Sequence, residues 1–192
     1  MKNNHAQKNP VNKFVIYTDG ASSIKCIVSG NTKHRLFYGG WAFVVIDSTT
    51  GKSVDYNSGG GRFKTGQAEL CAIGAAFDWL EKNGHRGCPV KFKTDSKYAI
   101  KTMVELIHRN DSELNYLANS HILKRLRQVV KRHGKRDLAR YYHVKGHDGN
   151  LHNETADELA VAAKHVFMGE WHVQDLDAIE SGALSISKSK SS

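Results

Sequence analysis

The chain has few cysteines, no long apolar run and fewer acidic than basic residues. Its three cysteines, Cys26, Cys71 and Cys88, are an odd number without CxxC spacing, which argues against a disulfide framework and a structural zinc site. No apolar run approaches the roughly 20 residues that span a bilayer, and residues 1–11 lack the apolar core of a signal peptide. These absences predict a protein of the reducing cytoplasm.

Positive charge is in excess, because 28 lysines and arginines stand against 19 acids, for a net charge of +9. Such an excess favours a polyanionic partner, nucleic acid first and an anionic membrane second. A basic protein without such a partner is the simpler alternative. The length of 192 residues suits one domain with a full hydrophobic core, with or without a tail.

The hydrophobic periodicity predicts an α/β domain with a five-stranded mixed sheet flanked by helices, in the order βββαβααβα. Glycine-containing turns separate the first three strands, which therefore form an antiparallel meander. The predicted strands cover residues 14–18, 39–46, 52–58, 90–94 and 138–144, and the predicted helices cover residues 65–82, 96–108, 117–133 and 153–167. The helix at 96–108 is expected to bury Ile100, Met103, Val104 and Ile107.

We expect the folded domain to cover residues 13–168, preceded by a flexible leader at 1–12. Residues 169–192 end in a low-complexity run of serine and lysine, which predicts a largely disordered tail. Residues 21–38, between the first two strands, are expected to form a long loop.

Four acidic residues stand where a strand ends or a helix begins, namely Asp19, Glu69, Asp95 and Asp157. Gathered in one place, their oxygens would hold hard divalent cations, Mg²⁺ above all, with Mn²⁺ as a substitute. Two such cations about 3.5–4 Å apart can activate a water and hold the leaving oxygen of a phosphodiester. The pattern therefore indicates a metal-dependent phosphodiester hydrolase.

Each of the four acids also has a simpler interpretation. These are a turn at Asp19, an offset of the helix dipole at Glu69, an N-cap at Asp95 and a plain surface acid at Asp157. Glu69, however, shares the apolar stripe of its helix with Ile73 and Leu80, which a glutamate serving only the dipole would avoid.

Five motifs, VIYTDG, QAEL, TDSKY, VKGH and NETADELA, occur in this order and resemble those of type 1 ribonuclease H. The resemblance covers residues 13–167 and implies the ribonuclease H-like fold. In that family, four carboxylates bind two magnesium ions and the enzyme cuts the RNA strand of RNA–DNA hybrids, leaving 5′-phosphate and 3′-hydroxyl ends. The resemblance implies Asp19, Glu69, Asp95 and Asp157 as the metal ligands.

The resemblance also assigns roles to two residues near the last helix. His147 would match a mobile histidine of the family that helps proton traffic or product release, and a pKa of about 6.5 suits proton exchange near neutrality. Taken alone, a loop histidine is more often solvent-facing. Asn153 matches a family asparagine near the metal site, although an N-cap of the last helix is the simpler and preferred interpretation.

The substrate-binding positions implied by the resemblance are Thr65, Gln67, Asn153, Lys124, Arg127 and Lys131. The three basic residues lie on one face of the helix at 117–133, in a region where several type 1 enzymes hold the DNA strand. A solvated basic face is the alternative. Recognition is expected to depend on the shape of the hybrid and the 2′-hydroxyl rather than on base sequence.

Two departures from the family affect substrate contacts. The family has a short loop rich in glycine and asparagine between its first two strands, whereas residues 21–38 are longer and carry Lys25, Lys33, His34 and Arg35. This segment could add a substrate contact of its own. In place of the family's asparagine pair, the chain has Thr65-Gly66.

The sequence thus predicts a monomeric endonuclease without a stable protein partner. Alternatives are another nuclease of the ribonuclease H-like superfamily, such as an exonuclease or junction resolvase, and a non-catalytic hybrid-binding module. A membrane-surface role is disfavoured, because the basic helix lacks an aromatic apolar face.

Overall fold

The computed structural model describes residues 13–29, 31–134 and 138–180. The strands are β1 (Phe14–Ser29), β2 (Thr32–Asp47), β3 (Ser53–Gly61), β4 (Val90–Thr94) and β5 (Ala139–His143). The helices are α1 (Thr65–Lys82), α2 (Lys97–His108), α3 (Asp111–Leu114), α4 (Ser120–His133) and α5 (Leu151–Glu180). Among the elements of the described residues, only the short helix α3 was not predicted from the periodicity.

The strands form one mixed sheet in the order β3-β2-β1-β4-β5. β1, β2 and β3 are joined antiparallel, while β4 runs parallel to both β1 and β5. This arrangement confirms the predicted mixed sheet with its antiparallel meander. It also makes β1 the central strand, so that its residues are close to elements from both halves of the chain.

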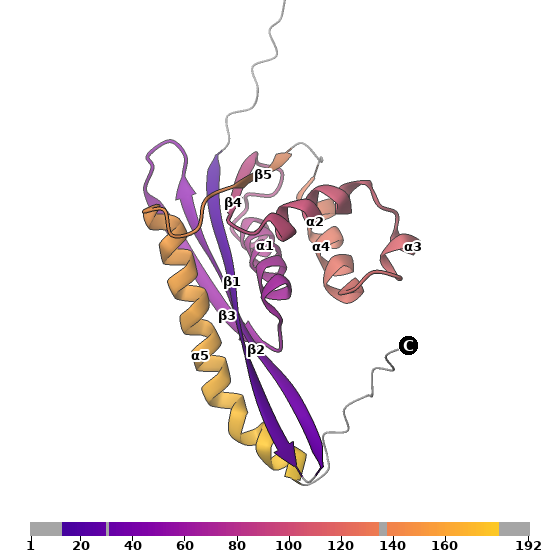
Figure 1. The fold of residues 1–192 in the computed structure, drawn as a ribbon. Coiled ribbons are helices and arrows are strands. Elements are labelled where there is room, and N and C mark those ends of the chain that lie inside the picture. Colours follow the sequence, from indigo (N-terminus) through magenta and orange to yellow (C-terminus); the bar gives the residue numbers. More distant parts are fainter. Residues whose placement is uncertain (1–12, 30, 135–137, 181–192) are drawn as a thin grey trace, which may run out of the picture.

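Helices cover both faces of the sheet (Figure 1). On one face, Phe43 and Phe92 pack with Leu70 and Ile73 of α1 in the main hydrophobic core, which extends to α2 and α4. On the other face, α5 contributes Ala156 to a second cluster. Both faces of the inner part of β2 are therefore covered. In the described ranges, no helix combines the length and apolar character needed to cross a membrane.

β1 and β2 continue far beyond the predicted strands and form a long hairpin. Their pairing is continuous from Phe14 opposite Asp47 to Ser29 opposite Thr32. The prediction of a loop at residues 21–38 is therefore wrong. We call the outer part of this hairpin, residues 21–29 and 32–40, the arm.

The arm is held by α5, which lies along it (Figure 1). Leu36 and Tyr38 of the arm are buried against Phe167 and Met168. The Phe167 ring in turn lies 5.8 Å from that of Trp171. α5 runs on to Glu180 instead of ending at 167, and the predicted disorder of residues 169–180 is wrong. The predicted leader at 1–12 and the end of the tail, 181–192, lie outside the described residues.

The buried face of α2 also differs from the prediction. The helix buries Ala99, Met103 and Leu106, while the side chain of Val104 is 48% exposed. Both stripes have helical spacing, so periodicity alone could not choose between them. The buried stripe is the one that packs in the main hydrophobic core, to which Phe92 also belongs.

Candidate active site

Asp19 lies in the middle of β1, where it pairs with Ala42 of β2. The strand runs straight through this position, so the interpretation of Asp19 as a turn former is wrong. Its carboxylate is only 8% exposed and accepts a hydrogen bond of 2.7 Å from the backbone N–H of Gly20. An ionisable group is thus held near the centre of the sheet.

Glu69 is brought to Asp19 by the close approach of α1 to β1. A Cβ atom on Gly20 would lie 2.3 Å from the backbone nitrogen of Glu69 and 2.9 Å from Cβ of Ala68. Only glycine leaves room for the first turn of α1 here. The Glu69 carboxylate accepts a hydrogen bond of 2.5 Å from the hydroxyl of Ser96.

Asp95 follows the last residue of β4, and the next residue caps α2. The Ser96 hydroxyl accepts a hydrogen bond of 3.0 Å from the backbone N–H of Ala99. Ser96 is therefore the N-cap, and the interpretation of Asp95 as the cap is wrong. The half-buried Asp95 side chain is instead covered by the loop before α5, since a Cβ on Gly146 would lie 2.6 Å from Asp95 Oδ2.

Asp157 comes from the second turn of α5, beside the fully buried Ala156. A carboxyl–carboxyl hydrogen bond joins it to Asp19 and raises the pKa of Asp19. Asp157 is half-buried, which does not suit a plain surface acid. Its place on α5 brings the far end of the chain to the central strand.

The electrostatics show that neighbouring acids act on one another in pairs. Burial is the largest cause that raises the pKa of Asp19, the hydrogen bond from Gly20 opposes it, and the negative charges of Asp95 and Asp157 add to the rise, so that the pKa reaches about 8. Burial also raises the pKa of Glu69, again with a contribution from Asp95, while the hydrogen bond from Ser96 opposes the increase. Two carboxylates about 4 Å apart repel by roughly 4 kcal/mol at an effective dielectric constant of 20. The cluster is therefore destabilised by its own charge.

Hard divalent cations suit this set of donors, because all four side chains offer carboxylate oxygens and none offers sulfur. Within the described residues, no three acidic, imidazole or thiol side chains are already placed to hold a metal ion. The contacts are pairwise, with Asp95 beside both Glu69 and Asp19, and Asp157 beside Asp19.

His147 lies on the exposed loop that follows β5, next to Gly146. Its backbone has a left-handed φ of 52°, which is uncommon for a residue with a side chain. The loop is tied to the sheet by Asn150, whose side-chain N–H donates to the hydroxyl of Tyr17 at 3.4 Å. An exposed imidazole thus stands in the loop that covers Asp95.

Asn150 also begins α5, because its side chain accepts from the backbone N–H of Asn153 at 3.2 Å. The preferred interpretation of Asn153 as the N-cap is therefore wrong. Asn153 is 4% exposed, and its side-chain oxygen has no hydrogen-bond partner among the described residues. A buried unpaired acceptor is costly, so this oxygen is available to a ligand donor.

Two predicted substrate-binding residues lie in the first turn of α1. The Thr65 hydroxyl is exposed and bonds to that of Ser22 at 2.7 Å. Gln67 is engaged within the protein, because its oxygen accepts from Lys64 N and its amide donates to Asn119 Oδ1, both at 2.8 Å. Thr65 is thus free to meet a ligand, whereas Gln67 would first have to release these partners.

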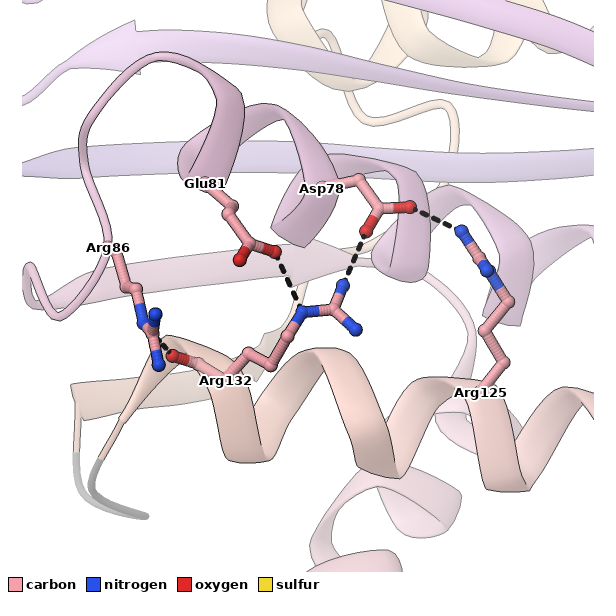
Figure 2. Close-up of polar contacts among 5 residues, drawn as sticks. All are labelled: Asp78, Glu81, Arg86, Arg125 and Arg132. Atoms are coloured by element: carbon pink, nitrogen blue, oxygen red, sulfur yellow. Dashed lines mark hydrogen bonds and ion pairs between the residues drawn. The ribbon is translucent and has the colours of Figure 1, made fainter.

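The basic face of α4 is partly neutralised by α1 (Figure 2). Arg132 contacts Glu81 at 2.9 Å and Asp78 at 3.2 Å. Arg125 contacts the other oxygen of Asp78 at 3.0 Å. These arginines join two helices of the domain and offer a polyanion less charge than their number indicates.

The three basic residues of α4 that are predicted to bind substrate differ in how far acidic residues neutralise them. Arg127 is only 16% exposed at its side chain, contacts Asp111 at 3.0 Å and donates to the carbonyl of Arg109. Lys131 also contacts Asp111, at 3.6 Å. Lys124 is exposed and forms no ion pair within the described part of the chain. The prediction that these residues bind substrate remains untested, and Lys124 is the best placed.

Three residues that position the site were missed by sequence reasoning, namely Ser96, Gly20 and Gly146. Ser96 had a usable signal, because serine directly before a helical stripe is a strong N-cap. Gly20 and Gly146 carried no sequence signal beyond their places next to Asp19 and His147. Each is needed because a segment distant in sequence packs closely against it.

The sequence model of the RNase H family matches residues 11–165. The chain therefore belongs to the RNase H family, and it is an RNase H enzyme. A ribonuclease H of Rhodopirellula baltica is 31% identical over 80% of this chain and 91% of its own length. One from Geotalea uraniireducens is 31% identical over 82% of this chain and 97% of its own length.

Solved structures show the same fold. RNase H1 from Halobacterium salinarum has a TM-score of 0.53 at 24% identity, over 78% of this chain and 96% of that chain. LC11-RNase H1, isolated from compost and solved in complex with an RNA/DNA hybrid, has a TM-score of 0.56 at 20% identity, over 80% of this chain and 97% of that chain. At these identities the likeness concerns the fold alone.

Proposed function

We propose that the protein is a metal-dependent endonuclease that hydrolyses the RNA strand of RNA–DNA hybrids and leaves 5′-phosphate and 3′-hydroxyl ends. Curated relatives over most of the chain are named ribonuclease H. A solved structure with the same fold holds an RNA/DNA hybrid. The acidic cluster supplies the chemistry that such a reaction needs.

The observation that carries the proposal is the buried like-charge cluster around Asp19. A fold gains no stability from carboxylates that raise one another's pKa, so their convergence indicates a ligand of opposite charge. Two Mg²⁺ or Mn²⁺ ions, when bound, would activate the attacking water and stabilise the leaving 3′ oxygen. Asp19, Glu69, Asp95 and Asp157 would hold them.

Other residues of the site would handle the proton and the substrate. His147, exposed in the loop that covers Asp95, would help proton transfer or product release. The Thr65 hydroxyl and the unpaired oxygen of Asn153 can hydrogen-bond ribose hydroxyls, which distinguish RNA from DNA. Gln67 would join them after releasing its partners, and Lys124, Arg127 and Lys131 would contact phosphates of the DNA strand.

The test is digestion of an internally labelled RNA–DNA hybrid with blocked ends, beside RNA duplex, DNA duplex and single-stranded RNA, with Mg²⁺ or with chelator. We expect internal cuts in the RNA of the hybrid alone, and only with the metal. Cutting confined to the ends of an unblocked hybrid would indicate an exonuclease, and binding without cutting would indicate a non-catalytic module.

A matched pair of variants tests the assignment of the ligands. Asp157→Asn removes one carboxylate of the cluster, whereas Glu158→Gln removes the exposed neighbouring acid on α5. We expect Asp157→Asn to lose cleavage while hybrid binding is largely kept, and Glu158→Gln to cut like the wild type. Near-normal cutting by Asp157→Asn would overturn the assignment.

A further inference from the structure

The arm has one face that no helix of the described residues covers. Leu36 and Tyr38 pack against α5. Paired residues of an antiparallel ladder project to the same side of the sheet, so the residues of β1 that pair with Leu36 and Tyr38 also face α5. The alternate residues face the other way, toward the side on which α1 lies. We call this set the open face, and it consists of Ser22, Ile24, Cys26, Lys33, Arg35 and Phe37.

The open face carries positive charge without compensation. No acid occurs between Asp19 and Asp47 in the sequence. Lys33 and Arg35 are exposed, and neither forms an ion pair within the described residues. The arginines of α4 that pair with Asp78, Glu81 and Asp111 differ in this respect. The two cations of the open face are therefore available to a polyanion.

By the same alternation Asp19 projects to the side of α5, but the open face reaches the start of α1 through Ser22. Ser22 lies on the same strand as Asp19 and bonds to Thr65 at the start of α1, the helix that carries Glu69. Lys64 lies over the ring of Phe37 at 5.1 Å from its centroid and adds a further cation beside this face. A ligand in contact with Thr65 would thus meet the open face next.

The reach of the arm follows from strand geometry. Cys26 pairs with Arg35 and stands seven residues along β1 from Asp19. At about 3.3 Å per residue this is roughly 23 Å, or about seven base pairs of duplex at about 3.4 Å each. The arm can therefore contact phosphates well outside the scissile position.

We propose that the open face binds the phosphate backbone of the same RNA–DNA hybrid, about seven base pairs from the scissile phosphodiester. This inference rests on the proposed function. The contact extends the footprint of the enzyme along the duplex and adds affinity that depends on salt and not on sequence.

The first experiment measures hybrid binding at several salt concentrations, with chelator to prevent cleavage. The double variant Lys33→Ala/Arg35→Ala removes charge from the open face, and Lys25→Ala removes charge from the face on the side of α5. With a hybrid of about 24 base pairs, losing two phosphate contacts should weaken binding roughly tenfold more at 50 mM salt than at 200 mM. Lys25→Ala should bind like the wild type.

The second experiment uses Cys26 as a chemical probe in the middle of the open face. The Cys26 thiol is exposed, whereas burial raises the pKa of Cys71 to about 11 and also raises the pKa of Cys88. Thiol reagents should therefore modify Cys26 first. Iodoacetate adds a negative charge there, and iodoacetamide adds a neutral group of nearly the same size. The carboxymethylated protein should bind the long hybrid several-fold more weakly than the carbamidomethylated protein.

The outcomes separate this inference from the proposed function. If the wild type cuts hybrids but the double variant binds the long hybrid with an unchanged salt dependence, the inference is wrong and the proposed function stands. Equal weakening by the double variant and by Lys25→Ala would also contradict a specific face. On a hybrid of about five base pairs, shorter than the roughly seven base pairs between the two places, the difference between the wild type and the double variant should shrink.

Discussion

Replacing Asp19 by asparagine should stabilise the metal-free protein at alkaline pH while removing its activity. In the unfolded chain this carboxyl ionises with a pKa of 3.8, whereas burial and the neighbouring acids raise its pKa in the fold to about 8. Between these values the folded state binds a proton that the unfolded state does not, so stability falls as pH rises. Each pKa unit corresponds to about 1.4 kcal/mol, which gives a penalty on the order of 5 kcal/mol above pH 8.

The assay is urea denaturation of the wild type and Asp19→Asn with chelator present. Asparagine keeps the shape of the side chain without the charge, so its advantage over the wild type should grow by about 4 kcal/mol between pH 5 and pH 9. Asp47→Asn is the control. Hydrogen bonds from Thr50 and Thr49 lower the pKa of this exposed carboxylate, so its replacement should not stabilise the fold at pH 9.

A cation should narrow the gap in stability between the two proteins. Magnesium at 100 times its dissociation constant would stabilise the wild type by about 2.7 kcal/mol, and Asp19→Asn should gain less. If Asp19→Asn is no more stable than the wild type at pH 9 without metal, Asp19 is not held among negative charges and the reasoning is refuted.

Further substitutions test how the site is positioned. Gly20→Ala should push α1 away from β1, lower stability by several kcal/mol and abolish cleavage. The control Gly169→Ala, in open space on α5, should be neutral or stabilise the fold by up to about 1 kcal/mol. Thermal unfolding would check both variants, and a Gly20→Ala protein as stable as the wild type would contradict the close approach of α1 to β1. Arg132→Ala should lower the free energy of unfolding by about 1 kcal/mol or less, because the ion pairs of Arg132 (Figure 2) are partly exposed. A much larger loss in denaturant titration would show that these ion pairs are better shielded from solvent than their exposure indicates.

The hydrophobic pattern predicted the sheet and the helices where local periodicity determines them. β4 and α1 have the predicted bounds. The arm could not be predicted in the same way, because its serine-rich strand is stabilised by Phe167 and Met168, which lie far away in the sequence. The continuation of α5 past residue 167 has the same cause, since a helix on the arm has a surface to bury that the isolated tail lacks.

The site was predicted as a set of element ends, but not in its details. Asp95 and Ser96 are both good N-cap residues, as are Asn150 and Asn153, and composition cannot choose between neighbours of the same propensity. Packing of the helix decides the choice, and it leaves Asp95 free to join the acidic cluster. The ion pairs of α4 with Asp78 were missed for a similar reason, because their partners lie on a helix that only the fold brings near.

The most direct measurement is anomalous scattering from crystals of the protein with an uncleaved hybrid, soaked in Mn²⁺. We predict two peaks about 4 Å apart, bound by oxygens of Asp19, Glu69, Asp95 and Asp157. Peaks found only at other places, with these carboxylates making no contact with manganese, would contradict the proposal.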